Sequence, residues 1–304
     1  NAPIKPATVT FVDIAGLVAG ASQGEGLGNQ FLSHIRTTNA IVHVIRAFQD
    51  PDIQHVDNQQ DPQKDIDVIN TELVLADLQT IDRRLPILQK EARANPKLRP
   101  EADYVEAVKT VLDSGKPLHQ DPAIMQHDLR EWLQKELQLI TLKPVIYVFN
   151  VDETGLTDTQ KVADLASLVA PAASIFISAK LESELRGLDQ ADAAELLASY
   201  GFTEVGLEQL IRAAYQTLGL QSYLTAGDKE VRAWTIPQGA TAPQAAGVIH
   251  DDFERGFIAA EVVGYGDLMA AGSLQAAKAA GKVRTEGKTY IMQPNDVVEF
   301  RFNV

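Results

Sequence analysis

The run at residues 143–150, KPVIYVFN, is the most strand-like segment of the chain and most constrains its fold. Two further apolar runs, at residues 40–47 and 173–178, also have the length and composition of buried strands. Helical patterns accompany them at residues 31–36, 125–139, 161–169 and 203–218. Strands and helices in this repeated order are typical of a mostly parallel sheet with helices on both faces. The sequence therefore predicts an α/β fold.

A glycine-rich stretch follows a further strand-like run at residues 8–14, TVTFVDI. The run includes Asp13, and Gly16 comes three residues later. In P-loop NTPases a carboxylate at this strand end holds Mg²⁺ through water, because the hard cation prefers oxygen ligands. The glycine brings its N–H close to the γ-phosphate, since no Cβ intervenes. Plain turns also use Asp-x-x-Gly, so the strand and the neighbouring glycines are needed to indicate a nucleotide site.

Leu17 occupies the position that holds a water-orienting glutamine in Ras-like GTPases. A leucine side chain neither donates nor accepts a hydrogen bond, so another group must position the attacking water. Leu17 is also suited to pack under the loop, and the two roles are compatible. We therefore place Leu17 in the catalytic region as the residue that replaces the glutamine.

Asn150 begins a second motif, Asn-Val-Asp-Glu, at the end of the most strand-like run. The guanine motif of P-loop GTPases is Asn-Lys-x-Asp, whose last carboxylate accepts two hydrogen bonds from the base. Here Glu153 is one methylene longer and Val151 replaces the lysine. Bidentate recognition needs fixed geometry, so we expect guanine selectivity to be lost. Adenine has no N1–H and does not need that acceptor.

The loop after the 173–178 run fits the segment that frames the base in this fold. It consists of Ser178, Ala179 and Lys180. Each motif is common when taken separately. Their order and spacing after Asp13 indicate one nucleotide-binding site.

A helical stripe within residues 67–139 is formed by Val74, Leu78, Ile81, Leu85 and Leu88. A second helical pattern occupies residues 104–112, after the breaks at Asn95-Pro96 and Arg99-Pro100. The pair predicts an antiparallel helical hairpin. Two ordinary surface helices remain the alternative.

The character of the chain changes after Leu220. Short strand candidates at residues 231–236, 256–263, 288–292 and 297–302 surround one helical pattern at residues 242–253. A mixed sheet packed on one helix is a compact α+β module. Lys229, Arg232 and Arg255 are candidates for an RNA contact there, and a solvated sheet face is the alternative for each.

Composition narrows the partners. The 304 residues include no cysteine, which excludes disulfide partners and thiolate zinc and fits a cytoplasmic protein. No apolar run is long enough for a membrane span, and no signal peptide is visible. The net charge of −14 opposes general nucleic-acid binding, so any RNA contact needs a local basic patch.

The strings FVDIAGLVAGASQGEGLGNQFLSHIR, LKPVIYVFNVDE and KEVRAWTIPQGATAPQAAGVIHDDFERGFI resemble the YchF/Obg-like ATPase family, over essentially the whole chain. The resemblance implies a Ras-like P-loop ATPase domain at residues 1–66 and 140–224 and a helical insertion at 67–139. It also implies a β-grasp TGS domain at residues 225–304. ATP as substrate, Mg²⁺ as cofactor and a ribosome or ribosomal RNA as partner follow from the same resemblance, as does a hydrophobic residue at the position of Leu17.

One family motif is not found in these residues. No Gly-x-x-x-x-Gly-Lys-Ser/Thr occurs, and the family places it upstream of residues 8–14. Without that cradle the β- and γ-phosphates lack their backbone N–H donors and lysine. We expect that a segment precedes Asn1 in the natural protein, because deleting a central strand and helix would destabilise the sheet. We also expect these 304 residues alone to bind nucleotide poorly.

His55 follows the 40–47 run in a polar loop, at the same predicted edge as Asp13. The family resemblance suggests that this histidine positions the attacking water, and an ordinary solvated loop histidine is the alternative. The leading functional hypothesis is an ATP-hydrolysing switch that associates with ribosomes. An Obg-type GTPase and a non-enzymatic ribosome or RNA interaction protein are the alternatives.

Overall fold

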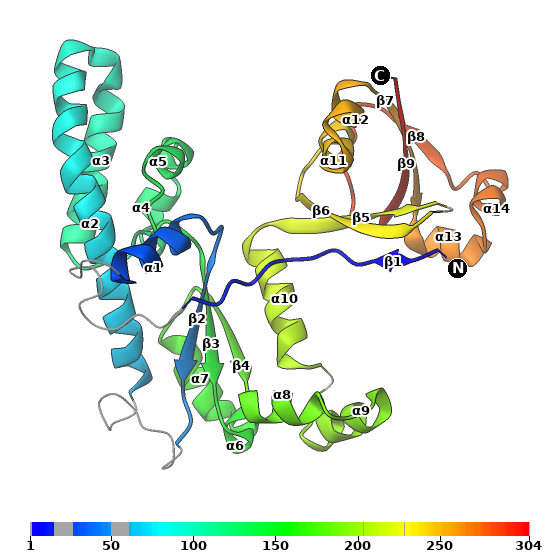
Figure 1. Cartoon of the computed structure of the whole chain (residues 1–304), viewed down its shortest axis with the longest axis horizontal. Coiled ribbons are helices and arrows are strands. Elements are labelled where there is room, and N and C mark those ends of the chain that lie inside the picture. The colour runs from blue at the N-terminus through cyan, green and yellow to red at the C-terminus, as the bar shows by residue number, and fades with distance from the viewer. Residues whose placement is uncertain (1, 15–26, 50–60, 203, 228, 304) are drawn as a thin grey trace. The chain divides into compact units, whose positions relative to one another are not determined.

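A three-stranded parallel sheet is at the centre of one of two compact units in the computed structural model (Figure 1). The structure describes residues 2–14, 27–49, 61–202, 204–227 and 229–303, apart from the side chains of 27–31 and 190. The central unit is Val12–Thr217, and the C-terminal unit joins Asn1–Phe11 to Leu218–Val304. No described helix is long and apolar enough to cross a lipid bilayer.

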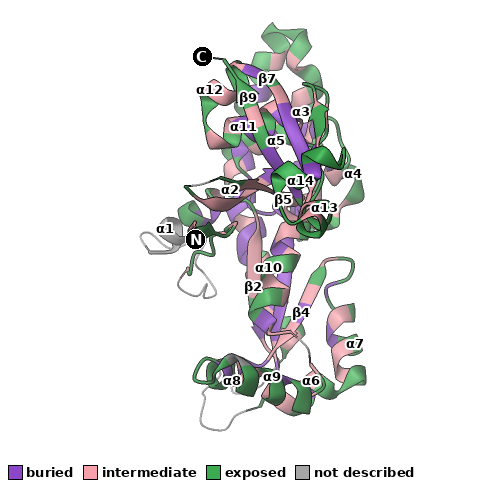
Figure 2. Cartoon of the chain, turned by 90° about the vertical axis from the view of Figure 1, so that its right-hand side faces the viewer, coloured by how far each residue is buried: buried purple, intermediate pink, exposed green. Residues whose placement is uncertain are grey.

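The sheet of the central unit has the order β2-β3-β4 and consists of β2 (Ile41–Arg46), β3 (Val145–Asn150) and β4 (Ala173–Ile177). Both pairings are parallel, with Arg46 opposite Asn150 and Asn150 opposite Ile177. Residues 145–149 of β3 are all buried, so both faces of the middle strand are covered (Figure 2). The prediction of a parallel sheet built on the 143–150 run is therefore confirmed.

Apart from the helical hairpin and the short helices that follow it, the helices of this unit surround the sheet and the loops at its edges. They are α1 (Leu27–Arg36), α6 (Glu153–Thr157), α7 (Thr159–Ser167), α8 (Ala179–Leu185), α9 (Gln190–Ser199) and α10 (Gly206–Thr217). Aspartate or serine caps several of them: Asp158 caps α7, and Ser178 caps α8. Such side chains satisfy backbone N–H groups that the helix itself leaves unpaired.

The predicted helical hairpin is confirmed. It consists of α2 (Pro62–Ala94), the 3-10 helix η1 (Pro96–Leu98) and α3 (Arg99–Asp113). The Asp61 carboxylate accepts from the Lys64 N–H at 3.1 Å and Pro62 occupies the first turn, so the start of α2 is well capped. Leu85, Leu88, Val105 and Val108 are buried together between the two helices. After α3 come η2 (Leu118–Gln120), α4 (Pro122–Met125) and α5 (Arg130–Leu137).

Asp77 joins the hairpin to the sheet. Its side chain is fully buried on α2, and it accepts from the Ile140 N–H at 2.9 Å and from the Thr141 N–H and hydroxyl at 2.7 and 2.8 Å. The Arg36 guanidinium lies 3.5 Å away. Burial raises the pKa of Asp77, while these hydrogen bonds and Arg36 favour the ionised form. The carboxylate thereby fixes α2 and α1 against the segment that leads into β3.

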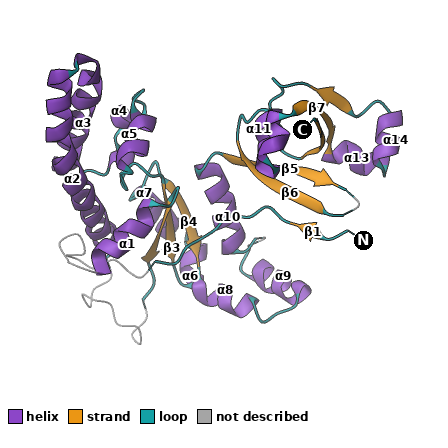
Figure 3. Ribbon diagram, turned by 45° about the horizontal axis from the view of Figure 1, so that its top comes forward, coloured by secondary structure: helices purple, strands orange, loops and turns teal. Residues whose placement is uncertain are grey.

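The C-terminal unit is a mixed six-stranded sheet of order β1-β6-β5-β9-β7-β8 (Figure 3). Its strands are β1 (Ile4–Lys5), β5 (Leu220–Ala226), β6 (Val231–Pro237), β7 (Phe257–Gly264), β8 (Arg284–Glu286) and β9 (Asp296–Phe302). Its helices are α11 (Ala242–Ile249), α12 (Asp251–Arg255), α13 (Tyr265–Ala271) and α14 (Leu274–Ala279). Tyr223, Ala245 and Val298 are buried in one core between the sheet and α11. Residue 224, the last residue of the predicted ATPase domain, lies inside β5.

Two strand predictions are wrong. Residues 6–14 form no strand, and most of residues 8–13 are exposed. An apolar run becomes a strand only where a neighbour completes its backbone hydrogen bonds, and no described strand pairs with these residues. At residues 288–292 the structure has only an isolated antiparallel bridge between Thr241 and Ile291.

Two predicted helices are each divided in the structure, and a histidine lies at each break. His127 follows α4, where its Nδ1 accepts from the Leu129 N–H at 3.1 Å and its ring stacks on Tyr104. His250 separates α11 from α12, and its Nδ1 accepts from the Asp252 N–H, also at 3.1 Å. Local side-chain acceptors of this kind compete with the helical hydrogen bonds, which is why the single helices predicted at 125–139 and 242–253 do not form.

Replacing Asp77 with alanine leaves the donors of Ile140, Thr141 and Arg36 without their buried acceptor. We expect Asp77→Ala to lower the free energy of unfolding by about 3–5 kcal/mol in urea denaturation. Asp82→Ala on the same helix is the matched control. The Asp82 side chain is 58% exposed in its ion pair with Lys109, so we expect a loss below about 1 kcal/mol. Equal losses in the two variants would contradict the role assigned to Asp77.

Candidate functional site

The carboxyl ends of β3 and β4 bring the two predicted base-binding segments together. Asn150 ends β3, and Ser178 follows β4 directly. The Asn150 side-chain oxygen accepts from the Ala179 N–H at 3.0 Å. This bond leaves the Asn150 amide nitrogen without a hydrogen bond among the described residues. A purine N7 is the kind of acceptor that such an amide can recognise.

Ser178 and Val151 are buried next to this edge of the sheet and stabilise it. Ser178 is buried, and its hydroxyl accepts from the Leu181 N–H at 3.3 Å as the cap of α8. Val151 is buried in the core beneath the sheet, and its N–H donates to the Ile177 carbonyl at 2.8 Å. The Val151 side chain therefore packs in the core.

Glu153 and Lys180 form an ion pair across the site. The Lys180 Nζ lies 2.9 Å from the Glu153 Oε1, and the side chains are 74% and 23% exposed. The hydrogen bond from Lys180 lowers the pKa of Glu153, and the same bond raises the pKa of Lys180. Glu153 is thus ionised at neutral pH, and one of its oxygens is already engaged by a cation.

Asp152 orients Glu153, and sequence reasoning gave it no role. Its carboxylate accepts from the Gly155 N–H at 2.6 Å and the Thr154 hydroxyl at 2.9 Å, and so caps α6. The hydrogen bond from Gly155 is the main reason why the pKa of Asp152 is lowered. The cap fixes the first turn of α6, where Glu153 lies. A capping residue directly before a helix was the available signal.

Arg46 is a second residue that sequence reasoning missed. It ends β2, opposite Asn150, and its guanidinium lies over the Phe48 ring at 4.7 Å. The carboxyl ends of parallel strands meet at one edge of a sheet, and this rule was the available signal. Arg46 therefore adds positive charge to the edge at which Asn150 lies.

The predicted phosphate side of the site is described only in part. Asp13 lies exposed in an extended segment, while Gly16, Leu17 and His55 are outside the described residues. No group of three or more His, Asp or Glu side chains suited to a metal occurs in the part of the chain that the structure describes. Asp13 is thus not part of such a group, and a cation held by its carboxylate would take other ligands from water and phosphate.

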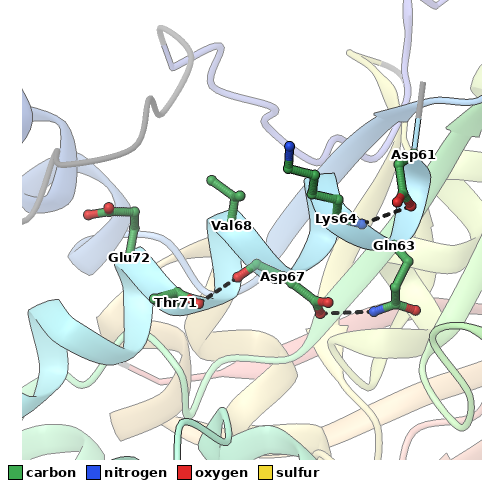
Figure 4. Close-up of a pocket in the computed structure, with 7 residues that line it drawn as sticks. All are labelled: Asp61, Gln63, Lys64, Asp67, Val68, Thr71 and Glu72. Atoms are coloured by element: carbon green, nitrogen blue, oxygen red, sulfur yellow. Dashed lines mark hydrogen bonds between the residues drawn. The ribbon is translucent and has the colours of Figure 1, made fainter. Parts of the chain in front are cut away.

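A surface hollow of about 410 Å³ lies along the first turns of α2 (Figure 4). It is lined by Asp61, Gln63, Lys64, Asp67, Val68, Thr71 and Glu72. The Gln63 amide donates to the Asp67 carboxylate at 2.8 Å, and Asp61 caps the helix. Three carboxylates among seven side chains make this hollow unsuited to a phosphate group. None of the predicted site residues that the structure describes lines it.

Two protein families match different parts of the chain. Residues 2–76 match a family described as 50S ribosome-binding GTPase. Residues 220–303 match the YchF-GTPase C-terminal family, which is described as a protein of unknown function.

Individual relatives match nearly the whole chain. It is 46% identical to the ribosome-binding ATPase YchF of Bacillus subtilis over 305 residues, which cover 98% of this chain and 82% of the relative. It is 47% identical to the protein of that name from Haemophilus influenzae, over 99% of this chain and 83% of the relative. The structure of the Schizosaccharomyces pombe YchF GTPase superposes with a TM-score of 0.83 at 34% identity, covering 98% of this chain and 82% of that one. The predicted P-loop NTPase fold class is therefore confirmed.

Removing the Lys180 ammonium tests the electrostatics of the base site. In Lys180→Ala we expect the Glu153 carboxyl to titrate at higher pH than in the wild type, because its main stabilising hydrogen bond is lost. Carboxyl ¹³C NMR measures the titration directly. Lys161→Ala is the control: Lys161 stabilises the charge of Asp152, so that variant moves the Asp152 titration and leaves Glu153 in place. An unchanged Glu153 titration in Lys180→Ala would show that the ion pair does not form in solution.

Proposed function

The chain belongs to the YchF family, and on that premise we propose that it acts as an ATP-hydrolysing molecular switch that associates with ribosomes. The named activity and partner of its relatives support both halves of this proposal. In the same proposal the ATPase domain comprises residues 1–66 and 140–224, and the helical insertion comprises 67–139. Residues 225–304 form a TGS domain.

The observation that carries the choice of ATP is the ion pair between Glu153 and Lys180. Guanine would need a carboxylate that accepts from its N1–H and its amino group together. In this chain one oxygen of Glu153 pairs with Lys180, and the longer side chain has an additional rotatable bond. The Asn150 amide serves any purine through N7, so it does not restore selectivity for guanine. Adenine lacks the N1–H donor and loses nothing at this position.

We assign the phosphate side of the site to Asp13, Gly16, Leu17 and His55. Asp13 would hold Mg²⁺ through water, and when bound the ion neutralises charge on the β- and γ-phosphates. Gly16 would donate its N–H to the γ-phosphate. Leu17 does not position water, and His55 takes that task as a hydrogen-bonding group from the neighbouring loop.

A GTPase of the Obg type is the second candidate. It is favoured by the description of the matching S. pombe structure as a GTPase and by the family that matches residues 2–76. Against it stands the engagement of Glu153 by Lys180. The two candidates differ in the base that the site selects, which is directly measurable.

We expect ATP to bind at least roughly tenfold more tightly than GTP, a difference of about 1.4 kcal/mol. Saturation-transfer NMR at millimolar nucleotide measures both affinities and detects weak binding through the base. Glu153→Asp restores the shorter carboxylate, and we expect it to reduce the ratio. Glu184→Asp, an exposed change on α8, is the control and leaves the ratio unchanged. Tighter binding of GTP by the wild type would reject the assignment of Asn150 and Glu153.

Histidine catalysis is tested by turnover. The 304 residues contain no Gly-x-x-x-x-Gly-Lys-Ser/Thr sequence. The assay therefore uses a fusion in which the N-terminal segment of a relative that has this motif precedes the chain. We expect His55→Ala to lower ribosome-stimulated ATP turnover by about tenfold or more, with ATP affinity unchanged, because only water positioning is lost. His34→Ala, at an exposed position of α1, is the control. Wild-type turnover in His55→Ala would remove that residue from the mechanism.

A further inference from the structure

The far half of the hairpin is basic in an otherwise acidic protein. Residues 83–100 contain six basic residues and one acidic residue, whereas the whole chain has a net charge of −14. They are Arg83, Arg84, Lys90, Arg93, Lys97, Arg99 and Glu91. They occupy the end of α2, the turn at η1 and the start of α3, at the end of the hairpin farthest from the sheet (Figure 1).

Three of these cations form a ridge on the outer face of α2, consisting of Arg83, Lys90 and Arg93. An α-helix turns by about 100° per residue, so the three side chains point within about 80° of one another. With a rise of about 1.5 Å per residue, the ridge is about 15 Å long. All three residues are exposed. No ion pair joins any of them to an acidic side chain in the described ranges of the chain.

The acidic residues of this part of α2 are engaged by cations that do not belong to the ridge. Asp82 lies 2.5 Å from Lys109 of α3. Glu91 lies 3.1 Å from Arg84, which also reaches Glu136 of α5 at 3.4 Å. The ridge therefore keeps its full charge, because Asp82 and Glu91 pair with Lys109 and Arg84.

Three acidic residues at the start of α3, Glu101, Asp103 and Glu106, limit this basic region on one side. Asp103 approaches Arg99 at 3.9 Å, and Glu106 is exposed. None of the three forms an ion pair with the ridge in the described structure. The positive surface is thus a line along α2 and does not surround the whole hairpin.

Distance separates Lys90 and Arg93, two of the three ridge cations, from the negative charge of the sheet and its helices. Lys90 and Arg93 lie about 20 and 24 Å along α2 from Asp77, where the helix is fixed to that part of the molecule. The Debye length at physiological ionic strength is about 8 Å, so acidic groups near the sheet are screened at this range. An approaching polyanion therefore meets an attractive field at the Lys90 and Arg93 end of the ridge.

We propose that the ridge of Arg83, Lys90 and Arg93 binds the phosphate backbone of RNA. A row of cations along one helix fits the regular charge of a nucleic-acid strand, and guanidinium groups bind phosphate oxygens in a bidentate manner. Only Ile87 and Pro86 add apolar surface between the cations. The ridge therefore recognises the charge of the phosphates and not the base sequence. The choice of RNA over an acidic protein rests on the proposed ribosome association.

The test compares a ridge variant with a charge-matched control. The variant is Arg83→Gln/Lys90→Gln/Arg93→Gln, in which glutamine preserves helix propensity. The control neutralises three exposed cations elsewhere, as Lys135→Gln/Arg186→Gln/Lys288→Gln. Both change the net charge equally, and unchanged melting temperatures establish that both fold.

The probe is a labelled 20-base-pair RNA duplex, titrated by fluorescence anisotropy between 50 and 200 mM KCl. We expect the ridge variant to bind at least about tenfold more weakly than the control, and its salt slope to fall by about 2–3. Equal binding by the ridge variant and the control overturns the proposal, as does a failure of the wild type to bind the duplex. Tighter wild-type binding to polyglutamate than to the duplex also overturns it, since the ridge then serves an acidic protein.

Sedimentation with ribosomes separates this inference from the proposed function. Wild-type protein that binds the duplex through the ridge but does not sediment with ribosomes leaves the RNA assignment standing and removes the ribosome association. Sedimentation that is equal for the wild type and the ridge variant overturns the role of the ridge and leaves the ribosome association standing.

Discussion

The buried carboxylate of Asp77 is the contact on which the arrangement of the central unit depends. It accepts three hydrogen bonds from Ile140 and Thr141, and β3 begins only four residues later, at Val145. The same carboxylate attracts Arg36 at the end of α1. A group buried in this way is costly unless every acceptor site is used, so α2 tolerates little displacement relative to β3. The base site at Asn150 and the hairpin therefore share one anchored element.

The sequence was most informative where a residue's position follows from the strand to which it belongs. The 143–150 run, Asn150 and the loop at Ser178 were predictable because buried parallel strands are continuously apolar and their carboxyl ends share an edge. The run at residues 8–14 shows the limit of that reasoning, since its apolar character says nothing about whether a partner strand is present. His127 and His250 show another limit. Each lies between two helices and accepts one backbone N–H at the start of the second, a contact that hydrophobic periodicity does not report.

The base site shows why motif reading alone is incomplete. Glu153 was predicted from its position in Asn-Val-Asp-Glu, and Lys180 from its place after β4, but nothing in either motif pairs them. The pairing arises because β3 and β4 are neighbours, which brings the starts of α6 and α8 together. Asp152 then fixes the turn from which Glu153 projects. Under the proposed function, base selectivity depends on two loops in contact, and the length of the Glu153 side chain is only one part of it.

The charged residues of this chain are unevenly distributed, which its net charge does not show. A charge of −14 argues against binding a polyanion when it is spread evenly, because the long-range field is repulsive. Salt screens this repulsion beyond about one Debye length, so the charges close to a surface decide whether that surface attracts a polyanion. A helix of 33 residues is long enough to place cations outside the reach of the acidic groups around the sheet. The length of α2 and its fixed base at Asp77 together allow an acidic protein to present a basic contact surface.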